Sequence, residues 1–349
     1  MLGIGVVPGA PDGVRVEELP EPDPSEGSLL VRGDLLGVCG TDADIVEKGY
    51  GAPPPGEERL RIGHESLGTV LEAPEGSGFS AGDRVAGIVR RPDPEPCAAC
   101  ADGQWDFCLN GRYTERGIQG LHGYGSQRWR VPPEYAVRVD PELGDCGVFI
   151  EPVSVLAKAW EQTERILART TLHPCVVLVT GAGPVGLFAA LLGVQRGYEV
   201  HVLDLNKRGP KPGLVADLGA TFHTGTPDSI GVAPDVVMEC TGHGPLAFSL
   251  TEVAAPGAVI CLTGISSGKK KVPAGLDELN KEMVLDNTVV FGSVNAARRN
   301  YEQAAADLAR ADRGWLERMI TRRVPMSGFA DALHKGQDEV KVVVDLQEE

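Results

Sequence analysis

The pattern of hydrophobic positions changes near residue 155 of this 349-residue chain. Before that point, short apolar runs such as SLLVRGDLLGV and DRVAGIV are separated by Gly- and Pro-rich turn signals, which is typical of β-structure with long loops. After it, VLAKAWEQTERILA has apolar residues at helical spacing, and CVVLVTGAGPVGLFAALLGVQRGYEVHVLDL alternates strand, glycine turn, helix and strand. The second pattern predicts a βαβ unit.

Further strand-like runs, DVVMECTG, GAVICLTGI and NTVVFGSV, alternate with helical or turn stretches and predict a parallel, doubly wound sheet. The chain is also longer than one core usually serves, since domains split beyond about 250–300 residues. We therefore expect an α/β protein with a β-rich domain over 1–155 and a dinucleotide-binding domain over 156–295. The tail, 296–349, ends in a helix and a strand that we expect to return to the first domain.

Hydrophobic residues make up 42% of the chain and charged residues 23%, as in ordinary globular proteins. The sequence has no apolar run near the ~20 residues of a membrane span, and MLGIGVVPGA lacks the basic start and cleavage site of a secretory signal. We therefore expect a cytoplasmic protein without a membrane partner. The formal charge of −16 argues against a nucleic-acid partner, and it fits either a salt-adapted protein or a plain acidic enzyme.

A glycine motif stands directly after the first strand of the βαβ unit. Gly181, Gly183 and Gly186 form G-x-G-x-x-G, and Pro184 and Val185 open the helix that follows. The glycines allow a tight turn, a close approach of pyrophosphate to the backbone, and close packing of helix and strand. The phosphates would bind at the helix N-terminus. The alternative interpretation is a glycine turn in a sheet that binds no nucleotide.

Asp204 ends the next strand-like run, near the position at which an acidic side chain holds the adenosine ribose. A 2′-phosphate would meet like charge there, so Asp204 favours NAD over NADP. Three polar or basic residues that follow at once are suited to bind a phosphate, which keeps NADP as an alternative cofactor: Asn206, Lys207 and Arg208.

Cys39, His64 and Glu151 offer the thiolate, imidazole and carboxylate of a catalytic zinc site that keeps a fourth position open. Taken singly, a lone Cys is usually a core residue and a lone His is usually a hydrogen-bonded surface residue. Their joint occurrence ahead of a dinucleotide motif favours zinc.

The chain resembles the zinc-dependent medium-chain dehydrogenases over essentially its whole length, through the order Cys39-Gly-x-Asp42, Gly63-His64-Glu65, a cysteine lobe and Gly181-x-Gly-x-x-Gly186. Within them it is most similar to the archaeal-type glucose 1-dehydrogenases. That likeness rests on more selective motifs: Tyr113-Thr-Glu115-Arg116-Gly117-Ile118, His122-Gly123-Tyr124, Phe149-Ile150-Glu151-Pro152 and Gly292-Ser293-Val294-Asn295. The resemblance implies a GroES-like β-rich catalytic domain and a Rossmann cofactor domain.

The resemblance also implies roles around the metal. In that subgroup the residues matching Cys39, His64 and Glu151 surround the catalytic zinc, and the carboxylate matching Glu65 lies beside it and exchanges into the shell. In the implied reaction, zinc polarises the substrate hydroxyl, and a hydride passes to C4 of the nicotinamide. The proton leaves through Thr41 and a nearby carboxylate or water.

Four positions are implied to contact the sugar: Thr41, Glu115, Glu151 and Asn295. Because several hydroxyls need several donors and acceptors, Glu115 and Asn295 suit a polyol better than a simple alcohol. A salt bridge from Glu115 to Arg112 or Arg116 is the alternative role for that carboxylate.

Asp44 stands where many relatives have a relay histidine, and it either relays protons or simply faces solvent. Strand C-terminal ends are where a Rossmann fold binds ligands. Residues at the ends of two later strands resemble the family's nicotinamide-proximal contacts: Thr263, Gly264, Ile265, Ser293, Val294 and Asn295.

Three of the eight cysteines cluster in the first domain: Cys97, Cys100 and Cys108. Clustered thiols in a large chain without a secretory signal more often hold metal than form disulfides. Relatives usually have four cysteines spaced C-x2-C-x2-C-x7-C around a structural zinc, but Pro94 stands at the first position here. Since proline cannot ligate metal, either Asp93, Glu95 or a water is the fourth ligand, or the site is empty. We favour a zinc ion completed by Asp93.

The leading functional interpretation is oxidation of an aldose, D-glucose or a near epimer, to its lactone with reduction of NAD or NADP. Another polyol, such as a cyclitol or an amino-sugar intermediate, is the alternative substrate. A non-catalytic nucleotide-binding protein is a third hypothesis, which the presence of all three zinc ligands argues against. The strand-like NTVVFGSV suggests pairing across a two-fold axis in a homodimer or homotetramer, although a terminal strand can also be capped within one chain.

Overall fold

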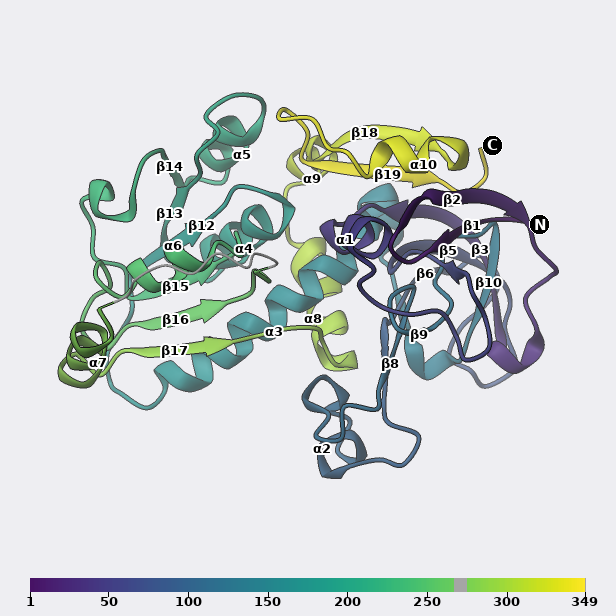
Figure 1. Ribbon diagram of the computed structural model, residues 1–349, viewed down its shortest axis with the longest axis horizontal. Coiled ribbons are helices and arrows are strands. Elements are labelled where there is room, and N and C mark those ends of the chain that lie inside the picture. Colours follow the sequence, from purple (N-terminus) through teal and green to yellow (C-terminus); the bar gives the residue numbers. More distant parts are fainter. Residues whose placement is uncertain (267–274, 349) are drawn as a thin grey trace. The chain divides into compact units, whose positions relative to one another are not determined.

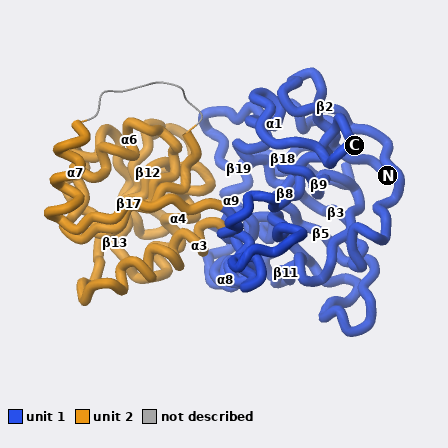
Figure 2. The backbone as a smooth tube through the Cα atoms, turned by 60° about the horizontal axis from the view of Figure 1, so that its bottom comes forward, with its two compact units in different colours: residues 1–154, 295–349 blue, residues 155–294 orange. Residues whose placement is uncertain are grey.

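The structure, a computed structural model, describes residues 1–266 and 275–348. Its backbone divides into two compact units (Figure 2). Unit 1 comprises residues 1–154 and 295–349, and unit 2 comprises residues 155–294. The boundaries of these units lie one residue before the domain boundaries expected from the sequence, at 155 and 295.

Unit 1 is organised around a seven-stranded sheet of order β11-β6-β5-β3-β19-β18, in which β10 also pairs with β3 (Figure 1). All pairs are antiparallel except β18 with β19. Because β19 pairs with β3, the last strand of the chain lies in the sheet of the N-terminal domain. The strands are β3 (Leu29–Gly37), β5 (Glu65–Glu72), β6 (Arg84–Gly87), β10 (Arg128–Val131), β11 (Ala136–Arg138), β18 (Ile320–Pro325) and β19 (Lys341–Asp345).

Two smaller sheets of unit 1 have the orders β2-β1-β4 and β7-β8-β9. Their strands are β1 (Leu2–Val7), β2 (Ala10–Glu18), β4 (Leu60–Arg61), β7 (Arg90–Arg91), β8 (Thr114–Arg116) and β9 (Gly120–Leu121). The α-helices of this unit are α1 (Gly40–Lys48), α2 (Ala98–Ala101), α8 (Arg298–Ala309), α9 (Arg313–Met319) and α10 (Phe329–Ala332). Short 3₁₀ segments cover Pro24–Glu26, Trp105–Phe107, Pro133–Tyr135, Pro141–Phe149 and Met326–Gly328.

The alternation along β3 explains how the core of unit 1 forms. Leu29 and Val31 are fully buried whereas Arg32 is exposed, as the two-residue period of a strand requires. Trp129 of β10 packs edge-on against Tyr124 with ring centroids 4.7 Å apart, and both rings are buried. The strands that lead to the candidate site therefore rest on a close-packed apolar layer.

Unit 2 is a six-stranded sheet of order β14-β13-β12-β15-β16-β17 in which every pair is parallel. Its strands are β12 (Val176–Thr180), β13 (Glu199–Leu203), β14 (Thr221–His223), β15 (Val236–Glu239), β16 (Val259–Leu262) and β17 (Val289–Gly292). The α-helices are α4 (Pro184–Gln195), α5 (Lys211–Asp217), α6 (Gly244–Ser249) and α7 (Leu276–Leu285), with a 3₁₀ turn at Pro227–Ile230. The helix α3 (Ile150–Leu167) runs from unit 1 into unit 2.

The strand order of unit 2 confirms the predicted doubly wound sheet. The chain order reverses between β12 and β15, and ligands bind in such folds outside the carboxyl ends of the strands at this point. The edge strand β17 is the one for which we expect pairing across a two-fold axis, and that pairing stays a prediction. Among the described residues, no helix is long and apolar enough to span a membrane.

Candidate active site

Cys39 lies between the end of β3 and the start of α1, where it is the N-cap residue of the helix. Its backbone N–H donates to Asp42 Oδ2 at 2.8 Å, which satisfies one donor at this turn. The thiol donates to Thr41 Oγ1 at 3.8 Å. The first turn of α1 therefore presents a thiol and a hydroxyl side by side.

The register of β3 with β5 brings His64 and Glu65 to Cys39. Gly37, at the end of β3, lies opposite Glu65 in this antiparallel pair. As a result, the ligand atoms of Cys39, His64 and Glu65 all lie within 4.8 Å of one another. His64, just before β5, and Glu65, its first residue, are deeply buried, with exposed fractions of 4% and 1%.

This group of donors fits a zinc ion. Thiolate, imidazole and carboxylate are the ligands that catalytic zinc takes, with one position left for a substrate or water. His64 Nδ1 faces Asp42 Oδ1 at 3.4 Å, and within the described residues both atoms are buried without a hydrogen bond. Since buried polar atoms in proteins normally have partners, their clustering beside a thiol is consistent with a site built for a cation.

Two charged residues, Asp42 and Lys341, contact members of this ligand group, and no role was predicted for either of them from the sequence. Burial opposes a charged His64, yet Asp42 and then Cys39 raise the pKa of His64 well above its usual range. Lys341, at the start of β19 and 2% exposed, forms an ion pair with Glu65. Asp42 was visible in the Cys39-Gly-x-Asp42 motif. Lys341 gave no sequence signal, because only the pairing of β19 with β3 brings it there.

Glu151 lies in the first turn of α3 and is 9% exposed. Burial raises the pKa of Glu151 to about 7, while the charge of His64 lowers it and that of Glu65 raises it. The carboxylate is therefore within electrostatic range of the metal group. The compact set of ligand atoms does not include it, and the role of Glu151 as a zinc ligand stays a prediction.

Glu115 of β8 lies directly opposite Arg90 of β7. Arg90 Nε and Nη2 donate to Glu115 Oε1 at 3.1 and 2.9 Å, and Asn295 Nδ2 donates to the same oxygen at 2.6 Å. The structure thus brings together two of the predicted sugar contacts. The buried salt bridge of Glu115 is made with Arg90, and not with Arg112 or Arg116 as the sequence alternative held.

The turn after Glu115 packs against the segment that bears His64. Gly117 adopts φ 73°, and a Cβ there would meet Gly63 O at 2.5 Å. Tyr124 N–H donates to the same carbonyl at 2.9 Å. Only glycine permits this approach, which holds the β8 segment against the residues next to the metal group.

Asp44, the candidate proton relay, lies three residues after Thr41 on α1. Residues three apart share a helix face, so the two side chains lie on one side of α1. The Asp44 carboxylate forms an ion pair with Lys48 at 2.6 Å and is 37% exposed. Both the relay and a merely solvent-facing role stay predictions.

The glycine motif forms the turn between β12 and α4 in unit 2. Gly181 adopts φ 87°, and a Cβ on Gly186 would lie 1.7 Å from Gly181 O, so that only glycine fits. Gly183 is the N-cap residue and Pro184 the first residue of α4. The helix N-terminus, including Val185, thus follows the turn directly, as a pyrophosphate site requires.

Asp204 follows β13 and is tied to the glycine turn. Its Oδ2 accepts from Ala182 N at 2.6 Å and its Oδ1 from Asn206 N at 2.7 Å, while Lys211 Nζ lies 3.5 Å from Oδ2. Gly181 and Asp204 line a cavity of about 450 Å³. Its other walls are Leu203, Leu205, Gly225, Thr226, Pro227, Thr241, His243, Pro245, Leu246 and Ser249.

The loops after β15 and β16 are held together by Glu239, which is 1% exposed and was not predicted. Thr263 donates to Glu239 O through its backbone N–H at 2.9 Å and its hydroxyl at 2.8 Å. Gly264 approaches Gly242 so closely that a Cβ would meet its nitrogen at 2.1 Å. After β17, Ser293 is buried. Other candidate cofactor residues are exposed: Lys207, Arg208, Ile265 and Val294.

Comparison with known proteins agrees with this geometry. The alcohol dehydrogenase GroES-like domain family matches residues 25–141, and the family described as glucose dehydrogenase C-terminus matches residues 144–346. Glucose 1-dehydrogenases of Thermoproteus tenax and Methanocella arvoryzae are 37% and 34% identical to this chain. The matches cover 99% of this chain and 100% and 99% of theirs. The chain belongs to the glucose 1-dehydrogenase family.

A solved structure of this glucose 1-dehydrogenase family gives the same fold. Glucose dehydrogenase from Haloferax mediterranei, in complex with NADP, Zn and gluconolactone, has a TM-score of 0.90 and 31% sequence identity to this chain. The match covers 99% of both chains. The family and the combination of a GroES-like domain with a Rossmann domain, both predicted from the sequence, are confirmed.

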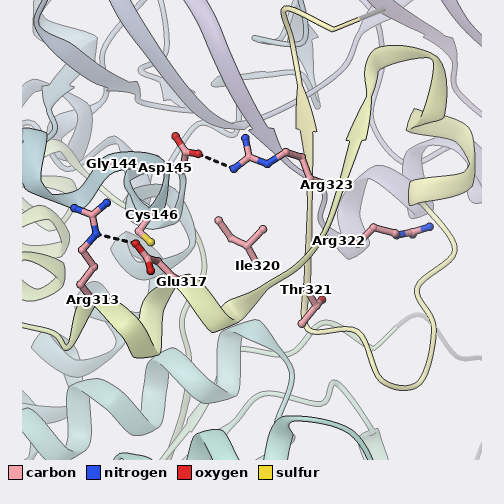
Figure 3. Close-up of a pocket in the computed structure, with 9 residues that line it drawn as sticks. All are labelled: Gly144, Asp145, Cys146, Arg313, Glu317, Ile320, Thr321, Arg322 and Arg323. Atoms are coloured by element: carbon pink, nitrogen blue, oxygen red, sulfur yellow. Dashed lines mark hydrogen bonds and ion pairs between the residues drawn. The ribbon is translucent and has the colours of Figure 1, made fainter.

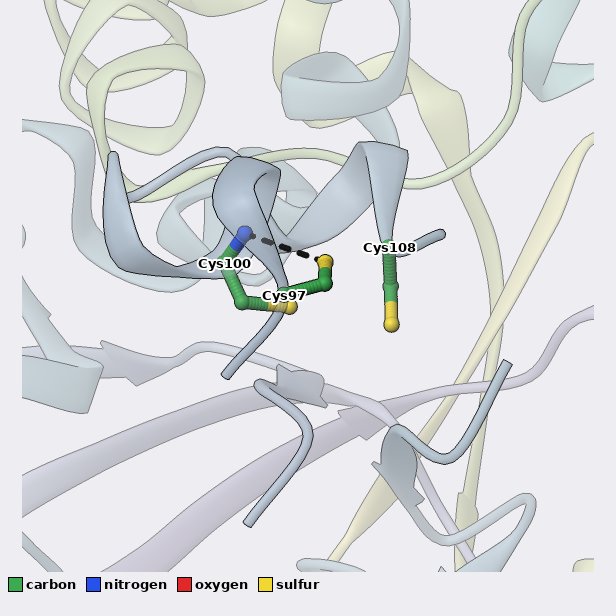
Figure 4. A group of neighbouring side chains, drawn as sticks. All are labelled: Cys97, Cys100 and Cys108. Atoms are coloured by element: carbon green, nitrogen blue, oxygen red, sulfur yellow. Dashed lines mark hydrogen bonds between the residues drawn. The ribbon is translucent and has the colours of Figure 1, made fainter. Parts of the chain in front are cut away.

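This glucose 1-dehydrogenase family member also has the predicted cysteine lobe (Figure 4). The ligand atoms of Cys97, Cys100 and Cys108 lie within 4.8 Å of one another. The backbone N–H groups of Leu109 and Cys100 lower the pKa of Cys97 to about 6, whereas burial raises the pKa of Cys100 to about 11. Three thiols, one of them with strong thiolate character, suit a soft metal ion such as zinc.

Asp93, the predicted fourth ligand of the lobe, is 1% exposed and held by protein donors. Its Oδ1 accepts from Glu95 N at 2.9 Å, and its Oδ2 accepts from Asn110 Nδ2 at 2.7 Å and Arg112 Nε at 3.2 Å. The group of three thiols does not include it. Ligation by Asp93 therefore stays a prediction.

A separate cavity of about 480 Å³ in unit 1 is lined by Gly144, Asp145, Cys146, Arg313, Glu317, Ile320, Thr321, Arg322 and Arg323 (Figure 3). Arg313 Nε pairs with Glu317 at 2.9 Å, and Arg323 Nη2 with Asp145 at 2.6 Å. Its wall is made of residues other than those of the candidate site, and its third arginine, Arg322, pairs with Glu339 at 2.8 Å outside the lining.

Proposed function

We propose that this protein oxidises an aldose, D-glucose or a near epimer, at its anomeric hydroxyl to the lactone and transfers the hydride to NAD or NADP. The observation that carries the proposal is the convergence of Cys39, His64 and Glu65 within 4.8 Å in a chain that also has a complete glycine turn. The Haloferax relative with bound NADP, Zn and gluconolactone supports the same chemistry.

Cys39, His64 and Glu151 would hold the zinc ion, with Glu65 beside it. A bound zinc ion polarises the substrate hydroxyl and lowers its pKa. Lys341 balances the charge of Glu65 and so limits its competition for the cation. Asp42 accepts from the backbone N–H of Cys39 and faces the imidazole of His64 at 3.4 Å, so one carboxylate lies against two of the proposed ligands.

The proton of the substrate hydroxyl leaves through residues of α1. Thr41 offers a hydroxyl beside the Cys39 thiol, and Asp44 lies on the same helix face with its carboxylate partly exposed. A hydroxyl at the reacting centre and a carboxylate nearer solvent form a short path for a proton.

Glu115, Glu151 and Asn295 bind the remaining hydroxyls of the sugar. Glu115 and Asn295 are already joined by a hydrogen bond of 2.6 Å, so an acceptor and an amide are fixed relative to each other. Such a fixed polar set suits a polyol, whose several hydroxyls need several partners.

The cofactor binds unit 2 through the turn at Gly181–Gly186 and through Asp204, with Thr263–Ile265 and Ser293–Asn295 near the nicotinamide. We propose NAD as the preferred cofactor, since a 2′-phosphate would meet the charge of Asp204. NADP is accepted as well, because Lys211 balances that charge and Lys207 and Arg208 are exposed beside it.

The proposal is tested by following the absorbance of reduced nicotinamide with D-glucose, its epimers, D-glucosamine and a cyclitol, with NAD and NADP offered separately. We expect turnover of D-glucose or an epimer with lactone as the product, and the larger kcat/KM with NAD. Turnover of only the cyclitol or the amino sugar would overturn the substrate class and leave the site residues in place. The absence of turnover across the panel, with zinc and cofactor bound, would contradict the proposal.

A further inference from the structure

Arg90 is held in one position next to the predicted sugar contact Glu115. It is 5% exposed, and its guanidinium lies over the ring of Tyr113 with Cζ 3.7 Å from the centroid. Arg90 Nη1 also donates to Asp106 O at 3.3 Å. Stacking on one side and a hydrogen bond at the end leave the planar group little freedom.

The two oxygens of Glu115 have very different surroundings. Three N–H groups converge on Oε1: two from Arg90, at 3.1 and 2.9 Å, and one from Asn295, at 2.6 Å. Within the described residues, the side-chain hydrogen bonds and the ion pair of Glu115 all go to Oε1, and none goes to Oε2. In this buried carboxylate, Oε2 is therefore the oxygen left without a protein donor and the one available to accept from an incoming group.

The third donor is fixed as well. Asn295 has φ 59°, a left-handed conformation that costs energy in a residue other than glycine. Its Oδ1 accepts from Ala296 N at 2.7 Å, which turns Nδ2 toward Glu115. Strain of this kind is kept where the surrounding structure imposes it, and it clusters at functional sites.

We propose that Arg90 is a positioning and specificity residue of the substrate site. It saturates Glu115 Oε1, so that Oε2 is presented as a single fixed acceptor for a sugar hydroxyl. It also cancels the charge of the carboxylate at close range. The inference rests on the proposed function and extends it, because it says which sugars the site prefers.

The charge balance decides that preference. A buried carboxylate without a cation attracts an ammonium group, because a close charge pair is strong where water is scarce. A carboxylate already paired with a guanidinium still accepts a hydroxyl proton but gains little from a second cation, which Arg90 repels. The site of this chain therefore prefers neutral polyols to sugars that carry an ammonium group.

The test compares Arg90→Gln with Arg91→Gln. Arg91 is the neighbour of Arg90 on the same short strand, so its side chain points to the opposite face, where it donates to Ile88 O at 2.7 Å. For each protein, kcat and KM are measured for D-glucose and for D-glucosamine at a pH at which the amine is protonated. Thermal unfolding and cofactor binding establish that the variants are folded.

We expect Arg90→Gln to raise KM for D-glucose by about tenfold with a smaller change in kcat. A tenfold change is the size expected when one charge-assisted hydrogen bond is lost from substrate binding. The ratio of kcat/KM for D-glucosamine to that for D-glucose rises by about tenfold, because the Glu115 charge is no longer balanced. In Arg91→Gln that ratio stays at its wild-type value. A loss of packing alone would lower kcat/KM equally for the two substrates and leave their ratio unchanged.

Arg90→Lys provides the second variant, and it carries the test if Arg90→Gln does not fold. Lysine keeps the charge but loses the planar fork, so KM for D-glucose rises while the preference against D-glucosamine stays. An unchanged KM and an unchanged substrate ratio in a folded Arg90 variant would overturn the inference alone. A wild-type protein that oxidises no neutral aldose would overturn the proposed function, and the inference with it.

Discussion

Unit 1 contains two clusters of candidate metal ligands, and they are built in different ways. The first, Cys39 with His64 and Glu65, stands at the ends of the paired core strands β3 and β5. Two of its three members, His64 and Glu65, are buried, and further charged side chains, Asp42 and Lys341, contact them. The register of the central sheet therefore sets its geometry.

The second cluster, Cys97 with Cys100 and Cys108, stands on a four-residue helix and a 3₁₀ turn. Only Cys100 is buried, and the partners of Cys97 are backbone N–H groups of the same loop. The difference teaches that ligands on core strands are positioned by sheet register and by buried charged neighbours, as a preorganised site requires. Ligands on a short loop are positioned by the backbone of that loop.

The largest effect that we expect comes from Cys39→Ala. Loss of a proposed zinc ligand weakens the binding of the ion that would polarise the substrate, and kcat/KM for the aldose falls by roughly 10³-fold or more, about 4 kcal/mol. Steady-state kinetics and zinc content measure it. Cys175→Ala, at an exposed cysteine of unit 2, is the control and keeps the wild-type rate. Substantial activity in Cys39→Ala would contradict the proposal that the reaction takes place at the core cluster.

Asp42→Asn has a smaller effect, because Asp42 acts through other residues. Its carboxylate orients both Cys39 and His64, and removal of such an outer partner typically costs about 10–100-fold in metal affinity or activity. The measurement is the retention of zinc and of rate during dialysis against increasing chelator. Glu47→Gln on the same helix, with a side chain that is 41% exposed, is the control. Equal zinc retention in the two variants would show that Asp42 merely caps α1.

Cys108→Ser should have the smallest effect on activity. Loss of one thiol weakens metal binding in the lobe and lowers the unfolding temperature by roughly 3–6 °C. This shift corresponds to a loss of about one to two kcal/mol in the free energy of unfolding of a unit of this size. The rate per folded molecule at saturating substrate stays within about twofold, because the core cluster and the lobe are separate groups of residues. Calorimetry and kinetics on the same sample measure both quantities. A fall in kcat as deep as that of Cys39→Ala would remove the distinction between the two clusters.

The same contrast explains how much the sequence could predict. Cys39, His64 and the glycine turn Gly181–Gly186 belong to short motifs whose spacing is itself the signal, so the sequence singles them out, and their roles stay predictions. The doubly wound sheet was predicted and is confirmed. Lys341 and Arg90 were missed, because strand pairings bring them to Glu65 and Glu115, and a single sequence does not reveal pairing register.

The cysteine lobe shows the same limit of prediction from a single sequence. The three thiols were predicted from their spacing, and the structure groups them. The hydrogen bonds of Asp93 to Asn110 and Arg112 depend on how the loop folds back, and no local pattern announced them. For that reason the sequence could offer Asp93 as a ligand but not place it.

We propose that zinc at the core cluster drives aldose oxidation, and removal and return of the metal test this role most directly. The protein is dialysed against a strong chelator, and the formation of reduced nicotinamide from D-glucose is followed before and after addition of Zn²⁺ or Mg²⁺. We predict that activity is lost with the metal and returns with Zn²⁺ but not with Mg²⁺, since a thiolate and an imidazole select the softer ion. Full activity in protein shown to be free of zinc would contradict the account.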